Sequence, residues 1–326
     1  MLVLLLSGSL QAKVFNYVGL YGQVGEWSLL PSQSDFGPSF GVNGGAGFVY
    51  ELQAGGKYAP TRFLMQVGVG PRAGMTSFIQ GSNMLVERKN QLDLQGDVFD
   101  YVYEIQNRHD SYTNIGVQVP ILIGVQHNKF YMLAGVKVNA NLIKTATTTA
   151  TLNTYGRYKE IPDLRNMEDY QFFSNYPLSG KASANLSNLS LDACLEIGGR
   201  FGGVFTNAVG FDVPKRKIEY RLAGFVEYGI GDIHSARSLE GFVAPQTYNG
   251  DDTYPVYNST SMIDNLQVND VMSTANFAAK VTNLVVGLKF TVLFPLPEEA
   301  KCVLCRDAYH SSARTHSSRR GMQYEE

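Results

Sequence analysis

The sequence predicts an all-β protein, an eight-stranded antiparallel transmembrane β-barrel with long extracellular loops and short periplasmic turns. The first observation is the alternation of apolar with polar or glycine residues throughout residues 112–126 and again throughout 130–142. Alternation with period two is typical of a strand that has one apolar and one polar face. Strands of soluble sheets run about five or six residues, whereas a tilted strand needs about 9–11 residues to cross a bilayer. This hairpin therefore has the length of a membrane-spanning pair.

The second observation is that the same pattern recurs along the chain. In the hairpin the β-branched positions run from Ile115 to Val125 and face one side, while Leu122, Tyr131 and Leu133 are apolar residues in the opposite phase. Six further segments alternate in the same way, which gives eight predicted strands. The predicted strands are residues 16–24, 42–53, 63–76, 112–126, 130–142, 189–202, 217–231 and 281–294.

The third observation is that long and short connections alternate between these strands. The long connections are residues 77–111, 145–188 and 232–279, together with the link between the first two strands. The short ones lie around residues 55–57, 127–129 and 207–215. Outer-membrane barrels sort their connections in this way, with the long loops outside the cell. The Thr-rich residues 144–152 are predicted to continue a strand above the membrane, because β-branched residues favour extended backbone.

Composition agrees with this class and excludes others. The chain has 326 residues, of which 44% are hydrophobic and 17% charged, so it can bury a core. A net charge of −2 provides no field for nucleic acid, which we therefore exclude as a partner. The sequence contains no apolar run long enough for a membrane-spanning helix. Its 3 cysteines are too few for a disulfide scaffold.

The two ends of the chain differ from the middle. Residues 1–12 are apolar and end in small residues, which predicts a secretory signal; since a basic start is missing, we expect the true start to lie upstream. Residues 13–297 form the predicted barrel, and residues 298–326 a flexible periplasmic tail. The tail contains Cys302 and Cys305, followed by His310 and His316. Their spacing is not that of a usual zinc finger, so the sequence favours a local disulfide or an exposed thiol pair over zinc.

The alternating pattern of residues 112–138, with Pro120 inside a strand and a three-residue turn at 127–129, resembles the small outer-membrane β-barrels of the OmpA/OmpX type. More narrowly, it is similar to barrels of Bacteroidetes-type envelopes. Residues 286–297 resemble a terminal barrel strand, in which Gly287, Phe290 and Val292 or Phe294 match the signal read by barrel-assembly machinery. Val285 stands where that signal has a polar residue, and the chain continues beyond the aromatic residue. The resemblance implies the outer membrane of a Gram-negative bacterium, with membrane lipid, lipopolysaccharide and the assembly machinery as partners.

Two prolines fall inside predicted strands, where a missing N–H removes a ladder hydrogen bond. Pro71 and Pro120 belong to neighbouring strands. We expect a shared bulge or kink there, across which the inward and outward phases could exchange.

The sequence predicts no enzyme, cofactor or metal site. Asp232, His234 and Ser235 follow the seventh strand, but adjacent residues on a strand point to opposite faces, so His234 and Ser235 cannot share a proton there. His109 and Asp110 fail the same requirement. No nucleophile, base and orienting group converge.

The polar faces of the predicted strands carry equal numbers of acidic and basic residues. An interior enclosed by eight strands is wide enough only for side chains to fill, so these charges must pair. We expect a closed ionic plug and a structural or partner-binding envelope protein, with a periplasmic or outer-membrane protein as partner. The alternatives left open are a small-solute porin and a rim-site outer-membrane hydrolase. The predicted interior ion network consists of Glu51, Arg72, Lys137, Asp192, Glu196, Arg200, Glu219, Arg221, Glu227 and Lys289.

Overall fold

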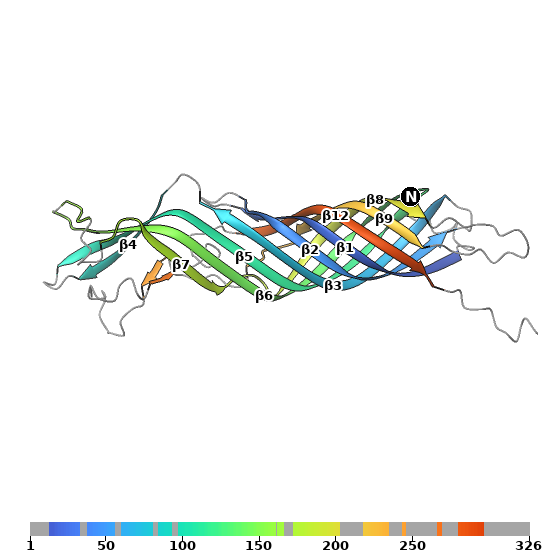
Figure 1. Ribbon diagram of the computed structural model, residues 1–326, viewed down its shortest axis with the longest axis horizontal. Coiled ribbons are helices and arrows are strands. Elements are labelled where there is room, and N and C mark those ends of the chain that lie inside the picture. The colour runs from blue at the N-terminus through green and yellow to red at the C-terminus, as the bar shows by residue number, and fades with distance from the viewer. Residues whose placement is uncertain are drawn as a thin grey trace, which may run out of the picture.

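A computed structural model describes residues 13–32, 38–55, 60–80, 84–92, 97–160, 162–165, 172–202, 218–234, 243–245, 266–268 and 280–296 (Figure 1). The described part of the chain is all-β. The predicted signal segment 1–12 and the tail 298–326, with Cys302 and Cys305, lie outside these residues. The strands are β1 (Lys13–Pro31), β2 (Phe40–Gly55), β3 (Thr61–Ile79), β4 (Leu85–Leu92), β5 (Val98–His127), β6 (Phe130–Arg157), β7 (Tyr176–Ser183), β8 (Leu189–Gly202), β9 (Glu219–Gly229), β10 (Val243–Pro245), β11 (Leu266–Val268) and β12 (Val281–Pro295).

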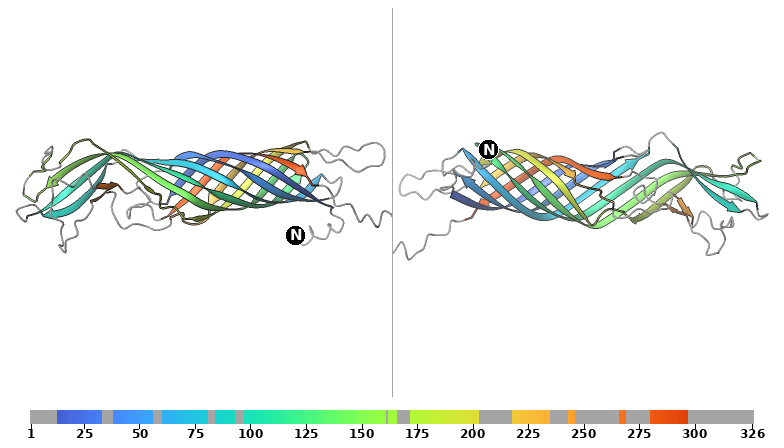
Figure 2. Two further views of the ribbon diagram at one scale, coloured as in Figure 1. Left: turned by 60° about the horizontal axis from the view of Figure 1, so that its bottom comes forward. Right: turned by 180° about the vertical axis from the view of Figure 1, so that it is seen from behind.

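The antiparallel pairings of the large sheet return to their starting point. The sequence of hydrogen-bonded neighbours is β1, β2, β3, β5, β6, β8, β9, β12 and again β1. The result is a barrel-like ring whose strands are tilted relative to a common axis (Figure 2). The end of β2, the start of β3, the β5–β6 turn, the start of β1 and the end of β12 lie at one end of the ring. We call this the short-turn end and the other the long-loop end.

Each of the eight predicted strands coincides with one strand of the ring. The predicted phase is also confirmed along the central hairpin, where Ile121, Ile123 and Val125 are exposed while Gln118 and Gln126 are buried. The three apolar exceptions, Leu122, Tyr131 and Leu133, face inward as their position requires. The outer surface is therefore apolar and the interior largely polar.

The exchange of phase expected at the two prolines does not occur. The register of β3 against β5 is the same from Val67↔Ile121 to Pro71↔Val117, so neither proline shifts it. The register shifts instead at two places in the β5–β6 pair, between Gln106 and His109 and between Ile115 and Gly116. Asn107, in the first shift, has a positive φ of 51°, which the backbone of a bulge can require. The prolines are accommodated without a change of phase.

The predicted long loops are partly strand. β5 begins at Val98 and β6 ends at Arg157, so both run well past the predicted strands, and residues 144–152 continue β6 as expected. β4 pairs with the start of β5, and β7 with β6 from Thr145 to Leu152. These four segments form a sheet that projects from the long-loop end (Figure 1), and we call it the extension.

One apolar core joins the extension to the ring. In the extension it contains Phe99, Tyr101, Tyr103, Leu152 and Phe172. At the long-loop end of the ring it continues through side chains that we call the apolar seal. The seal consists of Trp27, Leu29, Phe78, Tyr112, Val281 and Val285, all nearly or fully buried.

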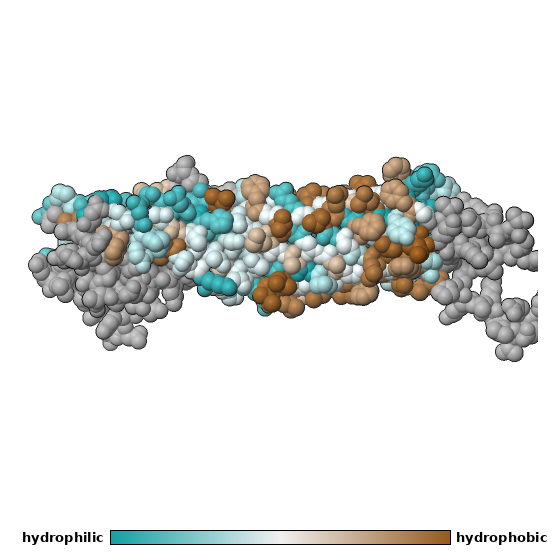
Figure 3. Space-filling view, in the orientation of Figure 1, coloured by the Kyte–Doolittle hydropathy of each residue, from teal (hydrophilic) through white to brown (hydrophobic). Residues whose placement is uncertain are grey.

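Exposed apolar side chains gather on the outside of the ring. Phe48, Phe130 and Leu288 are among the most exposed, at 69%, 73% and 58%. In Figure 3 the hydrophobic residues lie over the ring, whereas the described surface of the extension is mostly hydrophilic. Within the described ranges, no helix is both long and apolar enough to cross a membrane.

Candidate functional site

The ten predicted network residues all point into the ring, and each takes part in at least one ion pair. Nine of them are at most 4% exposed, and the side chain of Arg200 is 19% exposed near the short-turn end. Strand geometry explains the arrangement, because successive side chains of a strand point to opposite faces and these residues all stand at inward-facing positions. The interior charges are therefore gathered from β2, β3, β6, β8, β9 and β12.

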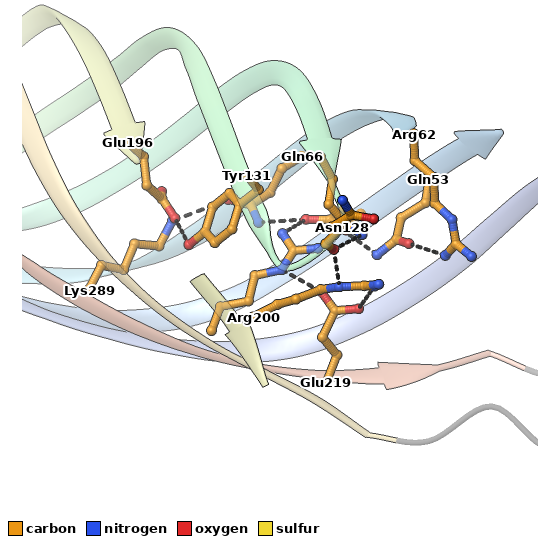
Figure 4. Close-up of polar contacts among 12 residues, drawn as sticks. Gln53, Arg62, Gln66, Asn128, Tyr131, Glu196, Arg200, Glu219 and Lys289 are labelled. Carbon is orange, nitrogen blue, oxygen red and sulfur yellow. Dashed lines mark hydrogen bonds and ion pairs between the residues drawn. The ribbon is translucent and has the colours of Figure 1, made fainter. Parts of the chain in front are cut away.

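Arg221 is the centre of the cluster at the short-turn end. Its two terminal nitrogens each donate to an oxygen of Glu51 at 2.6 Å, and its Nε donates to Glu219 at 2.7 Å. Glu219 also accepts from Arg200 at 3.3 Å, and Arg200 donates to the main-chain oxygen of Asn128 in the β5–β6 turn (Figure 4). Bidentate pairing of this kind gives the two planar groups a fixed geometry.

A second cluster lies beside the first. Lys289 pairs with Glu196 at 2.7 Å, and Glu196 also accepts a hydrogen bond of 2.7 Å from the hydroxyl of Tyr131 (Figure 4). Gln66 connects the two clusters, because its amide oxygen accepts from Lys289 at 3.2 Å and its nitrogen donates to Glu51 at 3.1 Å. Charges on β2 and β12 are thus connected through one amide of β3.

A third pair lies further toward the long-loop end. Lys137 forms an ion pair with Glu227 and donates to the amide oxygen of Gln23 at 3.0 Å. Gln23 donates in turn to Gln118 at 3.2 Å, and Gln118 donates to the hydroxyl of Tyr21 at 3.0 Å. This chain of side chains crosses the interior from one wall to the other.

The fourth pair is looser. Arg72 Nη1 lies 3.7 Å from Asp192 Oδ2, which is too long for a direct hydrogen bond. The same oxygen of Asp192 accepts from Asn139 at 2.6 Å and from Asn283 at 3.3 Å. Together the four groups place paired charges along the interior of the ring from the short-turn end toward the apolar seal.

The amides and hydroxyls that connect these charges were not predicted as site residues. Gln23, Gln66, Gln118 and Asn139 lie on polar faces that the alternation identifies, but their uncharged side chains gave no reason to single them out. The hydroxyl of Tyr131 was hidden by its apolar ring. An inward position beside a charged neighbour is the signal that would have identified them.

Inward-facing glycines leave room for a side chain at one position and for neighbouring strands at three others. A Cβ at Gly45 would lie 2.8 Å from Gln118 Nε2, so the absence of a side chain there leaves room for a long polar one. At Gly68, Gly135 and Gly198 an added Cβ would instead meet main-chain oxygens at 2.9, 2.1 and 2.5 Å. Those glycines allow close approach of neighbouring strands.

Of the rim candidates, the described residues place Asp232 and His234 in contact. His234 Nδ1 lies 3.1 Å from Asp232 Oδ1, and Ser235 lies outside the described residues. His109 points outward from β5, whereas Asp110 is buried and pairs with Arg108 at 3.0 Å. Within the described ranges, His, Cys, Asp and Glu side chains form no group of three that could hold a metal. Cys194 is buried and faces the interior.

A second charged group, which the sequence did not predict, lies on the outer face of the extension. Arg165 donates to both oxygens of Glu104 at 3.1 and 3.3 Å, and its guanidinium stacks 3.7 Å above the ring of Tyr155. Arg157 donates to both oxygens of Asp163 at 2.9 and 3.1 Å. We call these five residues the clasp, because they hold residues 162–165 against β5 and β6.

The clasp shifts the titration of its members. The hydrogen bonds from Arg157 lower the pKa of the Asp163 carboxyl below its ordinary value. On the inner face of the extension, burial raises the pKa of the Tyr101 hydroxyl to about 12. Both groups therefore keep one protonation state at neutral pH.

The chain matches no protein-family model and has no significant match among curated proteins.

Proposed function

We propose that this protein is an outer-membrane β-barrel of a Gram-negative bacterium whose ion-paired interior is closed, and that it acts as a structural or partner-binding component of the envelope. The observation that carries the proposal is the inverted polarity of the ring. Large apolar side chains cover its outside while charged ones fill its inside. In water this arrangement would expose apolar surface all round the ring, but in a bilayer that surface meets lipid.

The length of the strands supports the same assignment. A tilted strand needs about 9–11 residues to cross a bilayer, and each strand of the ring has at least 11 residues. β5 has 30 and β6 has 28, so both would continue beyond the membrane. The hydrophilic extension is the part that a partner outside the membrane would meet. The resemblance of residues 112–138 and 286–297 to OmpA/OmpX-type barrels favours the same class.

Closure is supported by the cross-connected charges. A lone charge in a narrow, dry interior is costly, and paired charges stay together because separation would leave each one unsolvated. The four ion-pair groups fill the interior in succession, and the apolar seal follows them. Passage of an ion would require several of these contacts to break at once.

Conductance measurement tests closure. Purified protein in planar bilayers is expected to show no steady current, because the interior pairs hold. The variant K137A/E227A removes one complete pair, leaves no lone charge and is expected to give more frequent brief openings. Stable channels from the unaltered protein would instead establish the small-solute porin.

Purification in gentle detergent tests the partner. Outer-membrane fractions are expected to contain the protein, and a fixed co-purifying protein would support the partner-binding reading. A variant that removes the Arg165–Glu104 pair of the clasp, R165A/E104A, serves as the control for binding through the extension. Turnover of lipid or peptide by the purified protein would favour the rim-site hydrolase.

A further inference from the structure

The interior contains one layer in which buried polar atoms lack protein partners. It lies between the Lys137–Glu227 pair and the apolar seal. We call it the middle layer, and its members are Asn43, Arg72, Asn114, Asn139, Asp192 and Asn283, with the indole of Trp27 at its border. All seven residues are at most 4% exposed.

Eight atoms of this group are buried without a hydrogen-bond partner among the described residues. Four are donors, namely Trp27 Nε1, Asn43 Nδ2 and the Nε and Nη1 of Arg72. Four are acceptors, namely the Oδ1 atoms of Asn114, Asn139, Asp192 and Asn283. Buried polar groups in folded proteins are nearly always paired, with protein or with ordered water.

The amide orientations follow from their hydrogen bonds. Asn139 and Asn283 both direct Nδ2 at Asp192 Oδ2, at 2.6 and 3.3 Å, which leaves their own oxygens unpaired. Asn114 directs Nδ2 at Asn141 Oδ1 at 2.7 Å, with the same result. Turning any of these amides would break an existing hydrogen bond.

Donors and acceptors come from different strands of the ring. The unpaired donors belong to β1, β2 and β3, and the unpaired acceptors to β5, β6, β8 and β12. Asn43, Gly74 and Asn114 are cross-strand neighbours, and a Cβ at Gly74 would lie 2.8 Å from the Trp27 ring and 3.1 Å from Asn43 Nδ2. The donor wall and the acceptor wall meet at Arg72 and Asp192.

The distance between Arg72 and Asp192 is that of a contact bridged by a water molecule. Arg72 Nη1 and Asp192 Oδ2 are 3.7 Å apart, and a polar contact beyond about 3.5 Å is a place where a water molecule can bridge. Water suits the layer better than a single ion, because it donates and accepts equally and makes about three hydrogen bonds to buried groups. A cation would meet the Arg72 guanidinium, and an anion would meet the Asp192 carboxylate.

We propose that the middle layer binds an ordered cluster of water molecules that joins the donor wall to the acceptor wall. The interior then has three zones: a dry ionic plug, a sealed hydrated layer and the apolar seal. The proposal depends on the packing of the interior and not on the membrane location.

Trp27 supplies the readout, since it is the single tryptophan of the chain. Its ring borders the layer at Gly74 and its buried Nε1 has no hydrogen-bond partner among the described residues, so water in the layer would shift its fluorescence emission to the red and make its lifetime longer in D2O than in H2O. The experiment uses the full chain, folded in detergent. We expect both signatures, together with shielding of Trp27 from added iodide, because the layer is sealed from bulk solvent.

Two variants make the test specific. R72M/D192L replaces the facing charges by apolar side chains and is expected to shift the emission to the blue and abolish the isotope effect. E196Q/K289M, in the ionic plug, is the matched control and is expected to leave the emission unchanged. If R72M/D192L does not fold, N43L tests the donor wall alone and is expected to reduce the isotope effect.

The opposing outcomes are distinct. Blue emission without an isotope effect in the unaltered protein would mean a dry layer and would overturn the proposal. An emission that changes on addition or removal of a particular ion would mean an ion site in place of water. Ready quenching by iodide would mean that the layer is open to solvent.

Discussion

Arg221 is the residue on which the interior charge balance depends most. It is fully buried, holds both oxygens of Glu51 and also pairs with Glu219. Removing one partner of a buried ion pair leaves an uncompensated charge, whereas removing both partners can be nearly neutral. At Arg221 truncation would leave two carboxylates without their shared cation.

We therefore expect Arg221→Met to lower the free energy of unfolding by about 3–5 kcal/mol. Arg200→Met, which removes a partly exposed cation from the same Glu219, is expected to cost about 1 kcal/mol. The measurement is urea unfolding in lipid vesicles, followed by fluorescence. R221M/E51Q should recover part of the loss. Equal losses for the two single variants would show that Arg221 does not hold the network together.

The clasp allows a prediction about pH. The pKa of Asp163 lies below its ordinary value of 3.8 in the folded protein, because Arg157 donates two hydrogen bonds to its carboxylate. A lowered folded pKa stabilises the clasp at pH above the unfolded pKa, and this stabilisation is lost as pH falls through the folded one.

Residues 157–165 are thus expected to become accessible below about pH 3.8, where the carboxyl of the released form is protonated. Pepsin cleavage between pH 2 and 5, read by mass spectrometry, measures this. Asp163→Asn should give the accessible pattern at every pH in that range. Cleavage of the unaltered protein that does not depend on pH would refute the clasp as a restraint.

At the scale of elements, the β5–β6 turn combines a tight connection with an interior contact. Asn128 has a φ of 55°, in the left-handed region that Asn and Gly adopt more readily than other residues. Its main-chain oxygen accepts from Arg200 at 2.9 Å. The turn conformation therefore positions the main-chain oxygen that binds Arg200 of the interior ion network.

Asn128→Gly is expected to leave stability nearly unchanged, while Asn128→Val should cost about 1–2 kcal/mol because a β-branched residue is strained at positive φ. Lys129→Val is the control, since residue 129 is not at positive φ. The same urea titration measures all three. A Val substitution at 128 that is no worse than at 129 would contradict the strain argument.

The alternation along the chain was sufficient to predict the eight strands of the ring and the direction of their faces. It predicts these features well because a period of two determines which side chains share a face. The charged interior residues followed from the same phase, since a charge on the inward face of a narrow ring has few partners other than an opposite charge.

The extension and the bulges could not be predicted in the same way. Residues 101–105 are buried on both faces, so they show no alternation of apolar with polar residues. The additional residues at 107–108 and 142 shift the register by one step, which only the partner strand reveals. The prolines do not change the register, although the β3–β5 pairing is interrupted at Gly68 and Val69, opposite Pro120 and Val119.

At the scale of the whole molecule, the ring and the extension differ in which surface is apolar. The ring is apolar outside and polar inside, whereas the extension has an aromatic core and a mostly hydrophilic surface (Figure 3). The change in polarity occurs along continuous strands, β5 and β6. A chain with this division would have its ring in lipid and its extension in water on one side.

Labelling of intact cells tests the proposed orientation. Lys159, beyond the end of β6, and Lys129, in the β5–β6 turn, are both exposed and lie at opposite ends of the long hairpin. In a chain with Cys302 and Cys305 changed to Ser, Lys159→Cys should react with a membrane-impermeant maleimide on intact cells. Lys129→Cys should react only after the outer membrane is opened, since the short turns are expected to face the periplasm. The buried Cys194 should stay unlabelled in both chains while the ring is folded. Labelling of residue 129 and not 159 on intact cells would reverse the orientation, and labelling of both without opening the membrane would contradict a transmembrane ring.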